Sequence, residues 1–260
     1  MLCLVGLLTG EAKAQLFLEN AKVVLAVSGG EHLNGSMIIH NMSPEPANIK
    51  VYWEDFDYTA PYDGAKKFFP AGTAPGSASQ WVTFSPQVFS VPPMGQQTVA
   101  YVVAVPSIIQ GGHYGVLFFE RAPDAVKTGK EDLSIVTRVG CLFFIEPKDK
   151  KKNALIQNIV LKANSITASF VNQGDVVLIP RTTFYIMSLD GMVFSRGVAN
   201  NVYVPPGAAG TLVIALKKQL NQGHYTVVVN CDLEDGDVVV KEIGLIVDSS
   251  GQLSLENTQS

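Results

Sequence analysis

Apolar and polar residues alternate over short runs along most of the chain, and clusters of Gly, Pro, Asn and Asp separate these runs. This two-residue period is typical of strands with one buried face. The first half is predicted to form strands at 17–27, 36–40, 49–53, 88–91, 98–105, 114–120 and 133–145. The second half is predicted to form strands at 156–162, 165–171, 183–187, 193–195, 211–216, 225–231 and 238–247. Because no segment has a convincing 3.6-residue amphipathic period, the fold class is predicted to be all-β.

Two motifs occur in both halves in the same order and at nearly the same spacing. Gln-Gly-Gly-His-Tyr at 110–114 is echoed by Asn-Gln-Gly-His-Tyr at 221–225, and Val-Pro-Pro at 91–93 is echoed at 204–206. Such a repeat indicates two related domains, each an antiparallel β-sandwich of about seven strands. The repeated tyrosine begins the sixth strand, where it can hydrogen-bond back to the backbone and close a corner. Asn41 and Asn172 end further strands that look equivalent.

The ends of the chain and its middle differ in composition from the strands. Leu2 to Leu8 form a short apolar run before Ala12-Lys13-Ala14, which matches an export leader with a small-residue cleavage site. This leader lacks a positively charged start, which indicates that the start codon lies upstream of Met1. The expected organisation is a signal peptide at 1–14, an N-terminal domain at 15–147, an exposed charged linker at 148–153, a C-terminal domain at 154–248 and a polar, frayed tail at 249–260.

Composition limits the compartment and the partners. The chain has 260 residues, of which 47% are apolar and 16% charged, and its net charge is −4, which argues against a nucleic-acid binder. No run after the leader reaches the roughly 18 apolar residues that a membrane span needs. We therefore expect a periplasmic or secreted protein. Cys141 and Cys231 lie in strongly apolar strands and are expected to be buried thiols rather than a disulfide.

Motifs that carry catalysis are missing from the sequence, so we expect no enzyme and no cofactor. His113 and His224 occupy the repeated corner, which favours a shared structural role. Acidic clusters at 54–57 and 232–237 offer oxygen ligands for calcium, but a covering loop and a solvated hairpin turn explain them without a metal. No metal site is predicted.

The connection after residue 53 is rich in aromatic side chains. It is expected to cover the edge of the sandwich or to form a secondary ligand loop, with candidate residues Trp53, Tyr58, Tyr62, Phe68 and Phe69.

The run at 133–145 is the most suggestive strand. Leu133, Ile135 and Val139 share one face by the two-residue period, whereas Arg138 points to the other. Such a strand is either the ordinary last strand of the sandwich or an open edge that accepts a partner's strand.

The segments 117–123 (Leu-Phe-Phe-Glu-Arg-Ala-Pro) and 137–147 (Thr-Arg-Val-Gly-Cys-Leu-Phe-Phe-Ile-Glu-Pro), with Lys-Val-Val-Leu at 22–25, resemble the periplasmic pilus-assembly chaperones. The resemblance implies two immunoglobulin-like domains set at an angle, which lend a strand to incomplete, pilin-like protein subunits of the cell envelope. It also implies that Lys22 and a cation on the seventh strand bind the subunit's terminal carboxylate. Gly140 best matches that second position, and Arg138 stands two residues earlier.

A competing resemblance rests on Ser77 to Trp81, Val91 to Pro93 and Gly111 to Gly115, which are similar to immunoglobulin-like modules of bacterial cell-surface proteins. It implies a structural or adhesive protein that binds an envelope component. A chaperone predicts an open apolar edge at 133–145 with Lys22 close to Arg138. An adhesive module predicts a covered edge and exposed aromatic residues clustered around 53–69.

Overall fold

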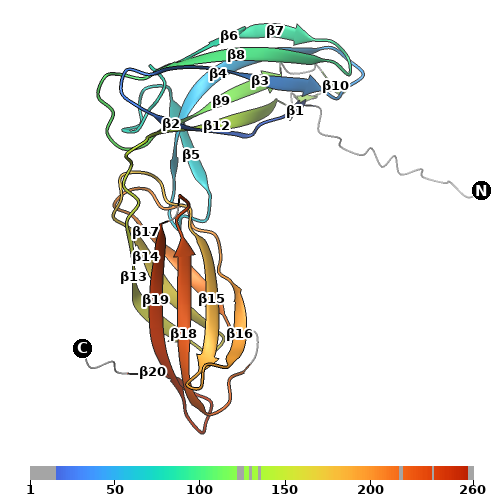
Figure 1. Cartoon of the computed structure of the whole chain (residues 1–260). Coiled ribbons are helices and arrows are strands. Elements are labelled where there is room, and N and C mark those ends of the chain that lie inside the picture. Colours follow the sequence, from blue (N-terminus) through green and yellow to red (C-terminus); the bar gives the residue numbers. More distant parts are fainter. Residues whose placement is uncertain are drawn as a thin grey trace, which may run out of the picture.

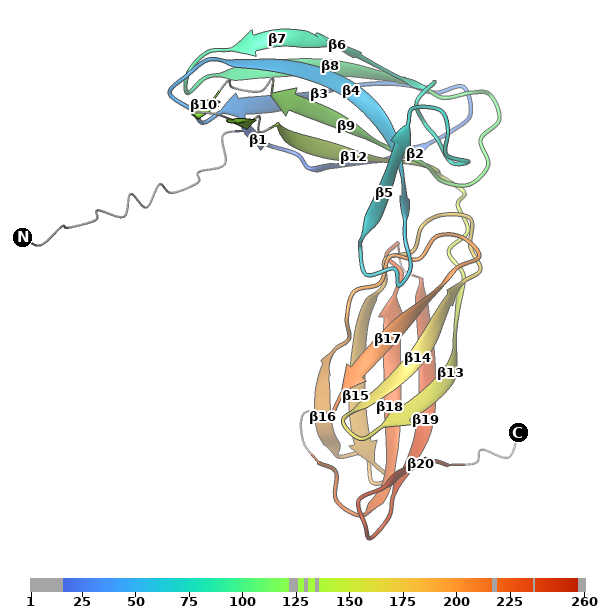
Figure 2. The same cartoon turned by 180° about the vertical axis from the view of Figure 1, so that it is seen from behind.

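The computed structural model describes residues 16–121, 126–128, 131–133, 136–216, 219–235 and 237–256. All its regular elements are β-strands, which confirms the predicted all-β class. Figures 1 and 2 show two β-sandwiches joined at an angle, the first containing β1 to β12 and the second β13 to β20. The described residues contain no helix long and apolar enough to cross a membrane.

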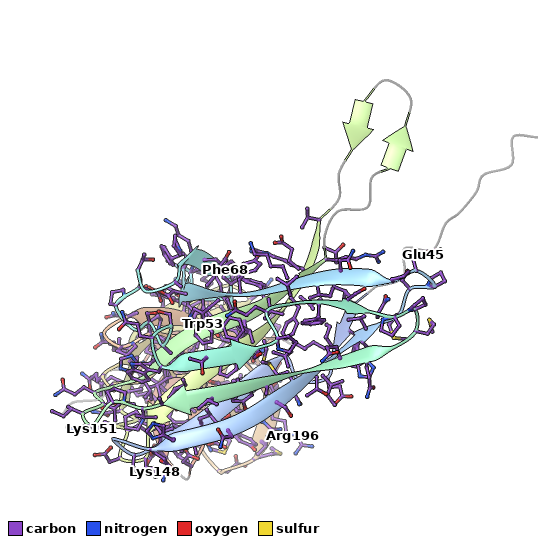
Figure 3. The ribbon with its side chains drawn as sticks, turned by 90° about the horizontal axis from the view of Figure 1, so that it is seen from above. Glu45, Trp53, Phe68, Lys148, Lys151 and Arg196 are labelled. Atoms are coloured by element: carbon purple, nitrogen blue, oxygen red, sulfur yellow. The ribbon has the colours of Figure 1, made fainter. Side chains whose placement is uncertain are left out.

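The first sandwich is built from two main sheets. Its four-stranded sheet has the order β1 (Leu16–Leu18), β3 (His32–Asn41), β8 (Gln96–Ala104) and β6 (Val82–Ser85). Its six-stranded sheet has the order β2 (Lys22–Val27), β12 (Thr137–Pro147), β9 (His113–Arg121), β4 (Ala47–Tyr58) and β5 (Lys66–Pro70), with β7 (Val88–Val91) also paired to β4. β2 and β12 run parallel, and the other strand pairs are antiparallel. The short hairpin of β10 (Val126–Thr128) and β11 (Glu131–Leu133) projects from the sandwich (Figure 3).

The second sandwich packs a three-stranded sheet on a five-stranded one. The first has the order β13 (Ala154–Lys162), β14 (Ser165–Asn172) and β17 (Ala209–Ala215). The second has the order β16 (Val193–Val198), β15 (Arg181–Ser188), β18 (Gly223–Asp232), β19 (Val238–Val247) and β20 (Leu253–Leu255). Each sandwich has its own apolar core, made by the inward-facing residues of both sheets. Cys141 and Cys231 are fully buried free thiols in these cores, as predicted.

A buried asparagine holds the same corner in both sandwiches. The Asn41 side-chain amide donates to the carbonyls of Val91 and Pro92, and Asn172 donates to that of Val204. Each asparagine also accepts a backbone N–H two residues further on. The Val-Pro-Pro repeat found in the sequence is therefore the acceptor side of this corner, and the predicted equivalence of the two asparagines is confirmed.

The repeated tyrosines, in contrast, have diverged. Tyr225 donates its hydroxyl proton to the carbonyl of Asn221 at 3.0 Å, which is the predicted corner. The hydroxyl of Tyr114 instead accepts a hydrogen bond at 2.7 Å from the backbone N–H of Val177 in the second sandwich. The prediction is right for the second copy and wrong for the first, where the tyrosine joins the two sandwiches.

Several predicted boundaries are wrong. The strand expected at 17–27 is two strands, β1 and β2, which belong to different sheets because the chain crosses between them after Leu18. The connection expected at 53–69 is largely the hairpin of β4 and β5. The tail expected to be frayed contains β20, which pairs with β19. The strand β6 was not predicted at all.

Candidate functional site

The strand β12 changes its surroundings halfway along its length. It pairs with β9 from Thr137 to Ile145, but with β2 only from Leu142 to Pro147. The segment 137–141 thus has a strand on one side only, among the described residues. This segment is an open sheet edge, and its free side presents backbone donors and acceptors that another strand can use.

The open side belongs to alternate residues. The N–H of Leu142 donates to the carbonyl of Ala21, at the start of the β2 side. Because backbone groups of alternate residues point the same way, the N–H and C=O of Gly140 and Arg138 also point away from β9. Within the part of the chain that the structure describes, no strand pairs with these backbone groups of Arg138 and Gly140.

The side chains of β12 are buried on one face, as predicted, and partly on the other. Cys141, Phe143 and Ile145 are 0% exposed in the core of the first sandwich, and Val139 packs against that core. Phe144, on the opposite face, is also buried, within a separate apolar cluster that includes residues of the second sandwich. The sequence did not predict this second cluster, because it requires the junction of the two sandwiches.

Arg138 lies on the outer face of the sheet, where it contacts two hydrogen-bond acceptors and two aromatic rings. Its guanidinium Nη1 donates to Glu54 Oε1 and to the Tyr52 hydroxyl, both at 3.2 Å. The guanidinium carbon lies 4.0 Å from the centre of the Phe118 ring and 5.5 Å from that of Phe68. The hydrogen bond to Tyr52 is the main cause that raises the pKa of Arg138, so this cation stays charged.

Gly140 explains how Phe118 comes to lie beside Arg138. A Cβ atom at Gly140 would lie 2.9 Å from the Phe118 ring and 2.8 Å from a Val116 methyl carbon. These neighbours occupy the space where the family resemblance places a lysine. A side chain at this position would have to displace Phe118.

Lys22 and Arg138 lie on the same face but do not point to one place. Lys22 is opposite Leu142 in the register, four residues from Arg138, which corresponds to roughly 13 Å along the strand. The Lys22 ammonium lies 4.5 Å from the centre of the Phe144 ring, further still from Arg138 along the strand. Two separate cations flank the open edge, not a converged pair.

Two further residues of the predicted edge, Leu133 and Ile135, precede β12 in the chain. Leu133 lies in β11, of which the structure describes the backbone, and Ile135 lies outside the described residues. The predicted apolar contribution of these two side chains stays a prediction.

The aromatic residues predicted as a ligand loop lie in three different places. Trp53 points into the core, 5.3 Å from the Phe143 ring, and Tyr58 and Tyr62 contact the second sandwich. Phe68 packs against Phe118, and Phe69 lies under the ammonium of Lys67. They form no common surface, so the geometry does not favour the adhesive alternative.

The first acidic cluster has an internal role. Asp55 is fully buried and accepts hydrogen bonds from the Trp53 indole, the Ser77 hydroxyl and the backbone N–H groups of Thr73 and Ala74. The carboxylate thereby fixes the loop that follows β5. The cluster therefore lies in the strand β4 and not in the covering loop that the sequence predicted, and its Asp55 carboxylate has hydrogen-bond partners within the protein.

The linker is exposed at Lys148, Asp149, Lys151 and Asn153, as predicted, but Lys150 and Lys152 are largely covered. The ammonium of Lys150 lies 3.1 Å from Glu146 and 3.2 Å from Asp235, and that of Lys152 lies 2.9 Å from Asp235. The lysine side chains are only 16% and 7% exposed. The lysines connect the last residues of β12 to a turn of the second sandwich.

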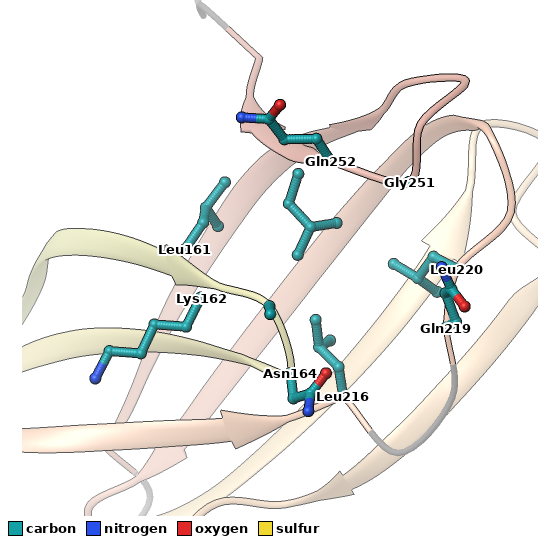
Figure 4. Close-up of a pocket in the computed structure, with 10 residues that line it drawn as sticks. Leu161, Lys162, Asn164, Leu216, Gln219, Leu220, Gly251 and Gln252 are labelled. Carbon is teal, nitrogen blue, oxygen red and sulfur yellow. The ribbon is translucent and has the colours of Figure 1, made fainter.

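A pocket of about 550 Å³ opens at the far end of the second sandwich, away from the β12 edge (Figure 4). Leucine side chains form its apolar walls, and Asn164, Gln219 and Gln252 supply amides. Lys162 is the one ionisable side chain among the described lining residues. The pocket therefore lacks the paired groups that acid–base or nucleophilic catalysis needs.

Comparisons with known proteins place the fold. No family model matches the sequence, and no curated protein sequence is significantly similar to it. Among solved structures, the class 5 fimbriae chaperone CfaA is 13% identical with a TM-score of 0.53, and the match covers 87% of this chain and 98% of that one. A structure described as a chaperone–tip adhesin complex of CFA/I fimbriae biogenesis matches at 14% identity and a TM-score of 0.52, covering 88% and 98%. This chain has the two-domain, immunoglobulin-like fold of these chaperones.

Proposed function

We propose that this protein is a non-enzymatic, periplasmic assembly chaperone that holds β-rich subunits of the cell envelope, such as pilin-like subunits, at the open edge of β12. The observation that carries the proposal is the segment 137–141, which pairs with β9 on one side and has no strand on the other among the described residues, because β2 begins opposite Leu142. The fold supports it, because one solved protein with this fold is described in complex with a tip adhesin.

The edge has the chemistry of strand addition. Backbone groups of Arg138 and Gly140 can hydrogen-bond to a partner strand of any sequence, while neighbouring side chains determine which partners bind best. Val139 faces the core side, and the predicted residues Leu133 and Ile135 would extend that apolar row toward a partner. This division suits a protein that binds several related subunits.

Lys22 and Arg138 have different roles in this proposal. Lys22 is exposed and has a ring beneath it, so its ammonium is free to meet a carboxylate of the subunit. Arg138 already bonds to Glu54, which a second carboxylate would have to replace. We assign the anchoring role to Lys22 and a supporting role in the architecture of the edge to Arg138.

The proposed organisation follows from this role. Residues 1–14 form an export leader, residues 15–147 the subunit-binding domain, 148–153 the linker, 154–248 the second domain and 249–260 the tail. Export places the mature protein in the periplasm, where envelope subunits pass before assembly.

Two substitutions at one position test the edge. Arg138→Ala and Arg138→Pro both remove the guanidinium, but only proline removes an N–H that points to the open side. In a pull-down from an envelope extract, with amide hydrogen exchange of residues 137–141 in the bound state, we expect wild type and Arg138→Ala to retain a small β-rich partner and Arg138→Pro to lose it. Equal binding by folded Arg138→Ala and Arg138→Pro, with no protection at 137–141, would show that the edge is not the binding site.

Lys22 is tested separately against a matched lysine. Lys22→Ala is expected to weaken capture of the same partner, whereas Lys50→Ala, which removes an exposed lysine from β4 in the same sheet, is expected to leave it unchanged. Equal effects of the two changes would contradict the anchoring role.

A further inference from the structure

The two sandwiches are joined by one crossing of the chain, the linker at 148–153. This linker follows β12, which lies beside β2 at one side of the six-stranded sheet. A single connection at one side of an interface acts as a hinge unless other contacts resist rotation. A second contact is most effective at the opposite side of the sheet, where β4 and β5 lie.

The β4–β5 hairpin makes that second contact. It reaches from the first sandwich to the second (Figures 1 and 2). The rings of Tyr58 and Tyr203 stack with centres 5.1 Å apart and an interplanar angle of 25°. The backbone N–H of Tyr203 also donates to the carbonyl of Tyr62 at 2.8 Å.

A cation strengthens the stacked pair. The Lys66 ammonium lies 4.9 Å from the centre of the Tyr58 ring and 5.9 Å from that of the Tyr203 ring. Lys66 is partly buried at this junction, and this desolvation lowers the pKa of its ammonium. Cation–π attraction is strongest for partly desolvated groups of this kind.

The hairpin tip is held by its own hydrogen bonds. The N–H of Thr59 donates to the carbonyl of Ala65, and that of Tyr62 donates to the carbonyl of Thr59. The N–H of Ala65 donates to the Asp63 carboxylate at 3.1 Å. These hydrogen bonds stabilise the conformation of the hairpin tip, so the tip can resist movement of one sandwich relative to the other.

A third contact lies between the hairpin and the linker. The N–H of Gly112 donates to the carbonyl of Asp175, and that of Val177 donates to the Tyr114 hydroxyl. Tyr114 belongs to β9, which lies between β12 and β4 in the sheet. The contacts between the sandwiches are therefore spread across the sheet, from the linker through β9 to the hairpin.

We propose that the β4–β5 hairpin is a strut that sets the angle between the two sandwiches, with Tyr58, Lys66 and Tyr203 as its positioning residues. The strut holds the second sandwich at a fixed distance from the open edge of β12. The benefit for partner binding rests on the proposed function: a subunit on that edge then meets a preformed angle and loses less entropy on binding. The strut itself does not depend on that function.

The angle can be measured in the free protein. Spin labels at Thr98→Cys on β8 and Lys241→Cys on β19 report the distance between the sandwiches. The native Cys141 and Cys231 are fully buried, and burial raises the pKa of both thiols, so they react poorly; Cys3→Ser removes the remaining thiol.

Removal of the stacked ring is expected to loosen the angle. In Tyr203→Ala we expect a shifted distance distribution, or one about twice as wide as that of wild type, as hinge motion is released. Tyr203→Phe keeps the ring and should keep the wild-type distribution, as should Tyr185→Ala, which removes a tyrosine of the second sandwich far from the junction. A wild-type distribution in Tyr203→Ala and in Lys66→Gln, with both sandwiches folded by amide hydrogen exchange, would overturn the strut.

The same variants separate the strut from the proposed function. Tyr203→Ala should weaken partner capture about tenfold through lost preorganisation. Arg138→Pro should abolish capture without changing the measured distance. A changed distance with unchanged capture would keep the strut and reject its benefit for binding.

Discussion

Gly140 shows how a single residue shapes the β12 edge. Glycine in the middle of a strand weakens it and is expected where another group approaches closely. Here the approaching groups are Phe118 and Val116, and the ring placed by this contact is the one on which Arg138 stacks. The absence of a side chain at Gly140 therefore determines where the guanidinium of Arg138, two residues earlier, lies.

This contact predicts the effect of a single methyl group. Gly140→Ala places a carbon 2.8 Å from Val116 and 2.9 Å from Phe118, so we expect it to destabilise the first sandwich by about 1–3 kcal/mol in urea unfolding. Phe118→Leu alone is destabilising, but combined with Gly140→Ala it should recover part of the loss. Strictly additive effects of the two changes would contradict the steric explanation.

The buried asparagines give a second prediction at this scale. In Asn172→Ala the carbonyl of Val176 and the N–H of Gly174 lose the partner that the side chain supplies, whereas the carbonyl of Val204 keeps its hydrogen bond from the N–H of Leu178. We expect the second sandwich to lose about 1–3 kcal/mol of unfolding free energy, because buried polar groups are left unsatisfied. Asn201→Ala, at an exposed position nearby, is the matched control and should change the unfolding midpoint little.

At the scale of elements, the sequence predicted strands and repeats well and junctions poorly. The alternation of apolar residues located 14 strand regions, because that pattern is imposed by one buried face. It could not show that the run at 17–27 passes from one sheet to the other, since both halves of the run are half-buried. It also missed the β4–β5 hairpin, because Asp55 and its neighbours have the composition of a loop while Asp55 is in fact buried and satisfied by hydrogen bonds.

The linker shows the same limit for charge. A run of lysines predicts a solvated connection when the partners are unknown. In the structure Lys150 and Lys152 meet Asp235, which is more than 80 residues away in the sequence. The pattern at 133–145 left an ordinary last strand and an open edge as alternatives. The register of β2 was needed to locate the open part at 137–141 and to separate Lys22 from Arg138.

The linker cluster predicts a dependence on pH. Hydrogen bonds from Lys152 and Lys150 hold the pKa of Asp235 below its ordinary value. Ionised Asp235 therefore contributes stability above its unfolded pKa of about 4, and this contribution is lost as the pH falls through that value to the lower folded pKa. In thermal unfolding, Asp235→Asn should be less stable than wild type at pH 6, and this difference should be smaller at pH 3. Asp237 lies in the same turn and makes no described contact with either lysine, so Asp237→Asn is the control and should show no such pH-dependent difference. If the stability difference between Asp235→Asn and wild type were the same at both pH values, the assignment would be contradicted.

The whole molecule shows how one repeated motif was divided between two tasks. Tyr225 closes a corner within its own sandwich, whereas Tyr114 is mostly buried at the junction and bonds to Val177. Burial is the main cause that raises the pKa of Tyr114, so its hydroxyl is neutral at any ordinary pH and acts as a hydrogen-bonding group. The sequence repeat could identify the pair, but only the partner across the junction distinguishes the two roles.

This division predicts different losses from the same chemical change. Tyr225→Phe removes a hydrogen bond inside the second sandwich and should lower its unfolding free energy by about 1 kcal/mol. Tyr114→Phe should leave the stability of the first sandwich itself unchanged. It removes the partner of the Val177 N–H, however, and should weaken the contact between the two sandwiches. Hydrogen exchange resolved by sandwich distinguishes them: Tyr225→Phe should accelerate exchange throughout the second core, and Tyr114→Phe should accelerate it locally around residues 175–178. If Tyr114→Phe instead destabilised the core of the first sandwich, the assignment of its hydroxyl to the junction would be contradicted, and the contact at β9 would rest on the hydrogen bond from Gly112 to Asp175.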